Sequence, residues 1–165
     1  MIWVSIETTG PHLGLGIYDE KVDGVLRVIA ESWQPAVAQQ AELLVPTLKK
    51  MIKRKMASIS AVAVDVGPGS FTGVRVGLAS ARAMAHALNI PLVGVCGLEA
   101  MAESIGKPAT LIGTFRPALS GDVYAAAYQN GKTILEPCWK KETWWNEWCR
   151  KRKALTLWTE VPTPR

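Results

Sequence analysis

Apolar residues recur along the chain at two different spacings, and each spacing predicts one kind of element. Apolar runs at 1–6 and 13–18 flank a turn of Glu, Thr, Gly and Pro, which indicates a β-hairpin. A third run at 25–30 follows an Asp-Gly turn and can supply another strand. Over 35–56 the apolar positions follow the period of an amphipathic helix instead. The pattern therefore predicts three antiparallel strands and then a helix.

Residues 61–88 predict a strand, a tight loop and a second helix. The Val-rich run that ends at Asp65 stops at the loop Gly-Pro-Gly-Ser-Phe-Thr-Gly, residues 67–73, and the chain then becomes Ala-rich. Ser70 or Thr72 can cap the first free N–H groups of this helix.

The glycine-rich loop at 67–73 admits two interpretations besides an ordinary turn. A loop of this kind that opens a helix can bind phosphate, because unpaired N–H groups and the helix dipole attract anions. Here Pro68 removes one N–H, and the Gly-Lys-Ser/Thr ending of a P-loop is absent. The helix also carries small residues one turn apart, which let another helix approach closely, and this favours a packing surface. The small residues are Gly73, Gly77, Ala81 and Ala85, and a more polar stripe beside them holds Arg75, Ala79, Arg82 and His86.

Residues 67–77, Gly-Pro-Gly-Ser-Phe-Thr-Gly-Val-Arg-Val-Gly, resemble the signature of the TsaB (YeaZ) family, the dimerisation subunit of the bacterial tRNA threonylcarbamoyladenosine machinery. Residues 40–46 resemble the family's His-Ser-Glu-x-Leu-Leu-Pro element, with Gln and Ala in place of His and Ser. Residues 121–126 resemble its Gly-Glu-Val-Tyr-Ala-Ala strand, although the family's preceding Asp-Ala-Arg-Arg is Pro-Ala-Leu-Ser here. The resemblance covers about residues 1–130 and fades from Lys132.

The predicted order of elements and this resemblance together imply an α/β fold with a mixed sheet. Three antiparallel strands, a helix, a strand and a helix follow one another in ribonuclease H-like and actin-like ATPase lobes, although the order alone permits other α+β folds. Residues 91–102 predict a short strand and a small helix, and 110–114 and 121–128 predict further strands. We therefore expect a ribonuclease H-like lobe at 1–105 and a reduced second lobe at 106–165 with a Trp-rich basic tail.

The composition is that of a globular protein without a membrane segment. Hydrophobic residues make up 48% of the 165, and no apolar run reaches the roughly 20 residues of a membrane span. The start of the chain lacks the basic segment, apolar core and cleavage site of a secretory signal. Cys96, Cys138 and Cys149 are odd in number and lack CxxC spacing, so neither a disulfide framework nor a zinc site is indicated. We expect a cytoplasmic protein with reduced thiols.

The first turn contains the residues that could contact a nucleotide. Actin-like ATPases hold a carboxylate and hydroxyls of their first hairpin near the phosphates, and Glu7, Thr8 and Thr9 occupy such a turn here. Asp65 is the only candidate for the second acidic residue that an ATPase would need. The alternative, which we favour, is that Thr8 and Thr9 bond backbone groups of the turn. A weak nucleotide pocket stays a hypothesis, and we expect no cofactor on this chain.

The segment 138–153 combines aromatic and basic residues. It carries six Lys or Arg against two Glu, in a chain of formal net charge +5. Trp rings can stack on unpaired bases while cations neutralise phosphates. The alternative, which we favour, is an amphipathic helix over 142–153 whose Trp145 and Trp148 dock on the first lobe and whose cations cap its end. If the tail contacts tRNA, the expected contacts are Arg150, Lys151, Arg152 and Lys153.

Catalytic groups are scarce in this sequence. Its two histidines, His12 and His86, do not form the His-x-x-x-His metal site that the resemblance assigns to the catalytic relative TsaD. The resemblance therefore implies a non-catalytic scaffold for a TsaD-like subunit, which transfers threonylcarbamoyl to the adenosine 3′ of the anticodon. It also implies a TsaE-like ATPase in the complex, tRNA as the substrate, and ATP or ADP and metal on the partner subunits. The alternatives are a small actin-like nucleotide hydrolase or kinase, and an RNA-binding module.

The two amphipathic helices supply the expected interface. The small-residue stripe of the second helix lies beside an apolar stripe. Together the two stripes offer more packing surface than a single core needs. We predict that the chain uses these helices to form homodimers when alone and to bind the TsaD-like subunit when it is present. The expected contacts are Glu42, Leu43, Pro46, Gly73, Val74, Arg75, Gly77, Leu78, Ala81, Arg82 and Ala85.

Overall fold

The computed structural model describes residues 1–52, 58–105, 110–118 and 121–158. The chain divides into two compact units: unit 1 comprises residues 1–66 and 70–95, and unit 2 comprises residues 67–69 and those from 96 onward. Within the described part of both units, no helix has the length and apolar character needed to cross a membrane.

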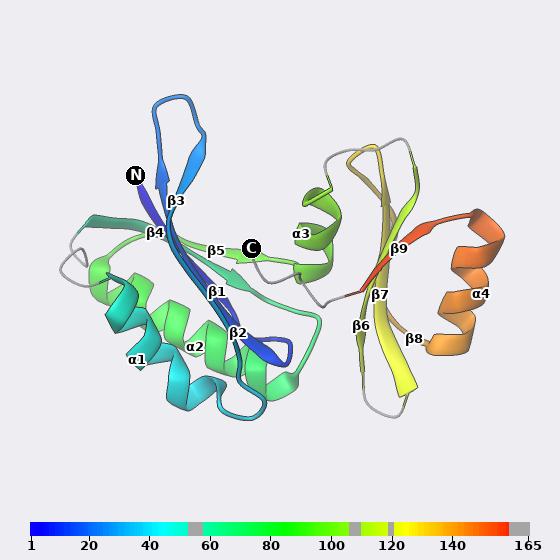
Figure 1. Cartoon of the computed structure of the whole chain (residues 1–165), viewed down its shortest axis with the longest axis horizontal. Helices are drawn as coiled ribbons and strands as arrows, with labels where there is room; N and C mark the ends of the chain where they lie inside the picture. The colour runs from blue at the N-terminus through cyan, green and yellow to red at the C-terminus, as the bar shows by residue number, and fades with distance from the viewer. Residues whose placement is uncertain (53–57, 106–109, 119–120, 159–165) are drawn as a thin grey trace. The chain divides into compact units, whose positions relative to one another are not determined.

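Unit 1 is built on a mixed sheet with two helices. Its elements are β1 Ile2–Glu7, β2 His12–Glu20, β3 Leu26–Pro35, α1 Gln40–Ile52, β4 Ile59–Asp65, α2 Phe71–Leu88 and β5 Leu92–Val95. The five strands have the order β3-β2-β1-β4-β5, and β1 pairs antiparallel with β2 and parallel with β4. α1 and α2 lie on the same face of this sheet (Figure 1). The three antiparallel strands, the helix and the strand-loop-helix predicted from the sequence are therefore confirmed.

The core of unit 1 lies between this sheet and the two helices. The strands β1, β2 and β4 supply buried side chains, and α1 supplies an apolar face that recurs every four residues. Burying each Val, Leu or Ile contributes roughly 1.5–3 kcal/mol. The set includes Val4 and Ile6 of β1, Leu13, Leu15 and Ile17 of β2, Val62 and Val64 of β4, and Leu44, Leu48 and Ile52 of α1.

α2 begins at the glycine-rich loop, as predicted. The hydroxyl of Ser70 accepts a hydrogen bond from the N–H of Gly73 at 3.2 Å, so Ser70 is the N-cap of this helix. The helix ends at Asn89, whose left-handed conformation (φ 51°) closes the last turn. Of the two caps that the sequence allowed, Ser70 is the one used.

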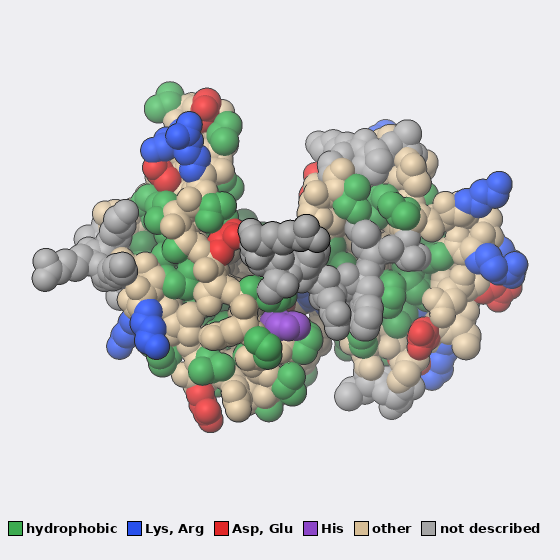
Figure 2. Space-filling view, in the orientation of Figure 1, with side chains coloured by type: hydrophobic (Ala, Val, Ile, Leu, Met, Phe, Trp, Pro, Cys, Tyr) green, Lys and Arg blue, Asp and Glu red, His purple; other side chains and the backbone are tan. Residues whose placement is uncertain are grey.

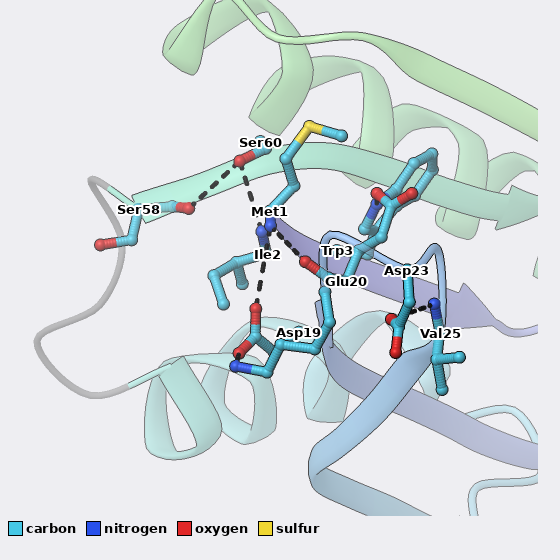
Figure 3. A network of polar contacts seen from close by, with 10 residues as sticks. Met1, Ile2, Trp3, Asp19, Glu20, Asp23, Val25, Ser58 and Ser60 are labelled. Atoms are coloured by element: carbon cyan, nitrogen blue, oxygen red, sulfur yellow. Dashed lines mark hydrogen bonds and ion pairs between the residues drawn. The ribbon is translucent and has the colours of Figure 1, made fainter.

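Polar contacts at the start of the chain join three strands of unit 1 (Figure 3). The amine of Met1 donates to the carbonyl oxygen of Glu20 at 2.8 Å, and the indole N–H of Trp3 donates to the Glu20 carboxylate at 2.7 Å. The N–H of Ile2 donates to the hydroxyl of Ser60 at 3.3 Å, which ties β1 to β4. These contacts support the register of β1 against both of its neighbours, β2 and β4. The same register places the carboxyl ends of β1 and β4 side by side, at the end of the strands away from these contacts.

Unit 2 is a four-stranded sheet with a helix on each face (Figure 1). Adjacent residues of its second strand, Ala125 and Ala126, pack toward different helices, because successive side chains of a strand point to opposite faces. The predicted strands at 110–114 and 121–128 correspond to β6 and β7, whereas the sequence did not predict β8 and β9. The elements are α3 Gly97–Glu103, β6 Ile112–Pro117, β7 Asp122–Gln129, β8 Lys132–Lys141, α4 Glu142–Arg152 and β9 Leu155–Trp158, and the strand order is β8-β7-β6-β9.

The docking of Trp145 corrects one expectation from the sequence. The helix predicted over 142–153 is present as α4. Its Trp145 was expected to pack on the first lobe, but it packs on the sheet of unit 2. Gly113 of β6 makes room for the indole, since a Cβ at Gly113 would lie 2.8 Å from the ring. Trp145 is 0% exposed and packs with Val123 and Cys149. α4 is therefore a structural part of unit 2.

The buried thiol of Cys149 should react far more slowly than the other two thiols of the chain. Burial raises the pKa of Cys149 to about 11, which leaves little of the reactive thiolate at pH 8. Cys96 and Cys138 are free and half-buried. A thiol-reactive dye at pH 8 should give a fast phase and a slow phase, and Cys149→Ala should remove the slow one. Equal rates for all three thiols would contradict this expectation.

Candidate functional site

An apolar groove of about 550 Å³ runs between α1 and α2 of unit 1. Its floor is the buried face of α1, and its walls include exposed small or apolar side chains such as Val45, Ala79 and Ala83. Both helices place their side chains in it at spacings of three and four residues, as amphipathic helices do. The lining residues are Leu44, Val45, Leu48, Lys49, Ile52, Ala79, Ser80, Ala83 and Met84.

The residues predicted as a partner interface divide into two groups. Seven of them are exposed or half-buried on α1 and α2 and remain accessible. Four others, the small-residue stripe of α2, are buried within unit 1, so they cannot themselves contact a partner. This part of the prediction is wrong, because the stripe packs against the chain's own sheet. The accessible group is Glu42, Leu43, Pro46, Val74, Arg75, Leu78 and Arg82, and the buried group is Gly73, Gly77, Ala81 and Ala85.

The two glycines of the stripe let α2 approach the end of β1. A Cβ at Gly73 would lie 1.9 Å from the carbonyl oxygen of Thr8, and a Cβ at Gly77 would lie 2.3 Å from its hydroxyl oxygen. The Thr8 hydroxyl donates to the carbonyl oxygen of Gly73 at 2.7 Å. A close approach at these glycines is therefore present, but the group that packs there is Thr8 of the chain's own turn after β1, where another helix was expected.

The turn after β1 brings the predicted nucleotide residues together with the end of β4. One carboxylate oxygen of Glu7, Oε1, accepts the N–H groups of Thr9 at 2.8 Å and Gly10 at 3.1 Å. The hydroxyl oxygen of Thr9 lies 2.8 Å from the same Glu7 oxygen and 2.9 Å from Oδ2 of Asp65. β1 and β4 are adjacent parallel strands, so their carboxyl ends meet at one edge of the sheet.

These bonds direct the polar groups of the turn inward. Thr8 and Thr9 are 0% and 2% exposed, and their hydroxyls bond the first turn of α2 and the two carboxylates. Because a hydroxyl carries one proton, Thr9 can donate to only one carboxylate at a time. Among the described residues, no three His, Cys, Asp or Glu side chains come together as a metal-binding group would require. The turn thus has the contacts that a structural role requires, and it holds two acidic groups close together.

The basic residues of the tail have unequal surroundings. Lys151 pairs with Glu147 one turn earlier at 2.7 Å, and this hydrogen bond lowers the pKa of the Glu147 carboxyl. The guanidinium of Arg152 lies over the Trp148 ring, 4.5 Å from its centroid. Arg150 and Lys153 are exposed at the end of α4. The four cations named as possible tRNA contacts therefore lie together on unit 2, but one of them already has an acidic partner.

The sequence missed several residues that line the groove. Ala79 belongs to the stripe that the sequence marked as the more polar one, and Ala83 and Met84 were assigned no role. The sequence signal for the groove was a pair of alanines, Ala79 and Ala83, one helical turn apart beside an apolar stripe. That signal was hidden because the more conspicuous glycines lie on the neighbouring face.

Comparisons with known proteins decide the family. Residues 30–142 match the family model described as TsaD, tRNA N6-adenosine threonylcarbamoyltransferase, and TsaB proteins are among the curated relatives. The chain belongs to the TsaB (YeaZ) family. It is 31% identical over 139 residues to TsaB of Bacillus subtilis, named as a tRNA threonylcarbamoyladenosine biosynthesis protein, covering 82% of this chain and 58% of that relative. It is 38% identical over 138 residues to an uncharacterised protein of Mycobacterium tuberculosis, covering 81% of this chain and 62% of the relative.

A solved TsaB-family structure confirms the fold class. YeaZ from Pseudomonas aeruginosa superposes with a TM-score of 0.66 at 21% identity, covering 84% of this chain and 65% of that one. The mixed α/β, ribonuclease H-like fold expected from the sequence is therefore correct. The chain spans about three-fifths of the length of the two curated relatives cited above.

Proposed function

We propose that this chain is a non-catalytic scaffold subunit of the machinery that makes threonylcarbamoyladenosine in tRNA. It binds a TsaD-like catalytic subunit, which transfers threonylcarbamoyl to the adenosine 3′ of the anticodon. The Bacillus subtilis relative is named for biosynthesis of this nucleoside, and the family model is named for the transferase. The observation that carries the proposal is the apolar groove between α1 and α2.

The groove has the features of a surface that receives a helix. Val45 is 46% exposed, and Ala79 and Ala83 are exposed beside it, so apolar atoms of both helices face outward. Small side chains on α2 leave space for the backbone of another helix, while the neighbouring Lys49 supplies charge among the lining residues. Covering such a groove removes apolar surface from water at roughly 25 cal/mol per Å². A partner with an apolar helix face fits this surface.

The same surface accounts for a homodimer when the chain is alone. Two copies each present an apolar helix pair, and a two-fold axis brings identical patches together. A TsaD-like subunit with a similar helix pair would compete with the second copy for the same surface. In this proposal the exchange of one partner for the other is how the scaffold engages the catalytic subunit.

The proposed absence of catalysis rests on the groups that the chain lacks or has already engaged. The sequence has two histidines, 74 positions apart in numbering, and no His-x-x-x-His pair. Oxygen Oε1 of Glu7 is occupied by two N–H groups and lies beside the Thr9 hydroxyl. The TsaD-like subunit would supply the metal and nucleotide chemistry, and a TsaE-like ATPase would join the complex.

Reconstitution tests this proposal. The purified chain should capture a TsaD-like protein, and tRNA modification by the TsaD-like subunit, the TsaE-like ATPase and a TsaC-like enzyme that makes the threonylcarbamoyl-adenylate should depend on adding it. Modified adenosine is measured by mass spectrometry of digested tRNA. Full modification without this chain, or no capture of the TsaD-like protein, would overturn the scaffold proposal.

A second candidate function is a small actin-like nucleotide hydrolase or kinase. The contact that favours it is the Thr9 hydroxyl between Glu7 and Asp65, at the edge of the sheet where the carboxyl ends of β1 and β4 meet. ATP turnover by the chain alone discriminates the two functions. Turnover that is abolished by Asp65→Ala would support the hydrolase and contradict a scaffold-only role.

A further inference from the structure

Four side chains spaced four residues apart form a continuous ladder that begins at the end of β8 and follows α4. Lys140 lies over the Trp144 ring, 4.9 Å from its centroid, and Arg152 lies over the Trp148 ring at 4.5 Å. The two rings stack at 6.3 Å between centroids and 30° between planes. Both cations are within the roughly 6 Å range of cation–π attraction. We call Lys140, Trp144, Trp148 and Arg152 the cation–aromatic ladder.

The ladder is held on a rigid support. Trp145 and Cys149, on the buried face of α4, pack into the core of unit 2, and Trp148 stacks on Trp145 with centroids 5.4 Å apart. Trp144 is 39% exposed, so part of its ring faces solvent. Trp144, Trp148 and Arg152 therefore belong to a helix whose opposite face is packed into the core of unit 2, and Lys140 adjoins them from the end of β8.

Most positive charge around the ladder is not neutralised by carboxylates. Residues 138–153 hold six basic and two acidic side chains, and Figure 2 shows Lys and Arg side chains gathered over α4. Lys141 pairs with Asp122 at 3.0 Å and Lys151 with Glu147. The remaining four cations form no ion pair with the residues that the structure describes. They are Lys140, Arg150, Arg152 and Lys153.

We propose that the cation–aromatic ladder binds unpaired nucleotides of RNA. Bases would stack on the exposed ring of Trp144 and beside Trp148, while Lys140 and Arg152 swing from the rings to the phosphates. The inference rests on the proposed function in one respect, because the RNA available to such a subunit is the tRNA that the complex modifies. It assigns to the ladder the contact that sequence reasoning placed on the four consecutive cations at the end of α4.

Two other partners explain the same residues less well. A membrane-surface helix buries a broad apolar face in the lipid, but the apolar face of α4 is already buried against its own sheet. An acidic protein segment would use the cations, yet it would leave the flat faces of two Trp rings without a matching group. Nucleotides use both parts of the ladder, because each one carries a phosphate and a planar base.

The experiment measures RNA binding by the full chain alone. A fluorescently labelled, unstructured oligouridine and an RNA duplex of equal length are titrated, and anisotropy gives Kd at several salt concentrations. We expect tighter binding of the single strand, because bases in a duplex cannot stack on protein rings. Trp144→Leu should weaken single-strand binding roughly 5- to 150-fold, the range for loss of one stacked base. Trp144→Phe should keep most of the affinity.

Two neighbouring charge changes separate the ladder from general electrostatic attraction. Arg152→Gln and Lys151→Gln each remove one positive charge, but only Arg152 belongs to the ladder. Arg152→Gln should weaken binding more and make the salt slope shallower by about 0.7. Equal effects of the two changes, or equal affinity for duplex and single strand, would overturn the ladder as the binding site.

Two further measurements test other partners and separate the RNA-binding proposal from the scaffold proposal. Binding to phosphatidylserine vesicles and to polyglutamate is measured for the original chain and for Trp144→Leu. If Trp144→Leu weakens either of these as strongly as it weakens RNA binding, the assignment to RNA is overturned. Capture of a TsaD-like protein is measured on the same variants and should be unchanged. If capture fails while RNA binding depends on the ladder, the scaffold proposal is wrong and the ladder is still a nucleotide site.

Discussion

Replacing Gly73 by alanine is expected to destabilise unit 1. In an open helix this change gains up to about 1 kcal/mol of helix propensity. Here the new Cβ would lie 1.9 Å from the carbonyl oxygen of Thr8, a backbone atom that cannot rotate away. Overpacking costs roughly 1–3 kcal/mol and sometimes more, so the clash should outweigh the gain. Thermal unfolding followed by circular dichroism should show a midpoint lower by about 3 °C or more.

Gly77 provides a matched comparison, because its closest atom belongs to a side chain. A Cβ at Gly77 would lie 2.3 Å from the Thr8 hydroxyl oxygen. Thr8→Ala removes that oxygen, so it should relieve Gly77→Ala but not Gly73→Ala in double-mutant cycles. Gly10→Ala serves as the control, since a Cβ there meets nothing closer than 3.9 Å. A Gly73→Ala protein with unchanged stability would show that α2 does not require this approach.

The period of the apolar residues was sufficient to predict most of unit 1. Two apolar runs and the turn residues between them predicted the first hairpin, and Leu44, Leu48 and Ile52 marked the buried face of α1. The loop before α2 was predicted together with Ser70 as one of two possible caps. These features are local, because neighbouring residues alone decide them.

The partner of a helix face is not a local property, and here the sequence misled. The glycines at 73 and 77 indicate that another group packs closely on α2. Their four-residue spacing is the same whether that group belongs to another chain or to the chain's own turn after β1. The contact between Thr8 and α2 joins residues 65 positions apart. Only the three-dimensional structure shows that Thr8, directly after β1, packs on this side of the helix, while Ala79 and Ala83 line the groove.

The same limit explains why Trp145 was assigned to the wrong surface. β8 is mostly exposed and contains Pro137, so its sequence lacks the apolar alternation that marks a half-buried strand. Without β8 and β9, the second lobe offered no complete sheet for an amphipathic helix to cover. The structure shows that this sheet exists and that Gly113 provides the space for the indole.

Replacing Ala83 by arginine is expected to abolish association through the α1–α2 groove. Ala83 is exposed and lines the groove, so an arginine can extend from α2 without disturbing the core of unit 1. In the proposed interface its guanidinium would be covered by apolar atoms without a partner, which costs several kcal/mol. We expect Kd for the TsaD-like subunit, and for a second copy of this chain, to rise at least about thirtyfold, or roughly 2 kcal/mol. Calorimetry and sedimentation measure the two associations.

Ala100→Arg is the matched control, because Ala100 is an exposed helical alanine in unit 2 and lies outside the groove. It adds the same charge and bulk, so a general effect of charge should appear in both variants. Both proteins should unfold at the temperature of the original chain, which separates loss of binding from loss of fold. If Ala83→Arg retains both associations, the groove is not the interface, and the scaffold proposal would need a different surface. If it loses homodimerisation but keeps the TsaD-like partner, the two associations use different surfaces, and the competition inferred between them is wrong.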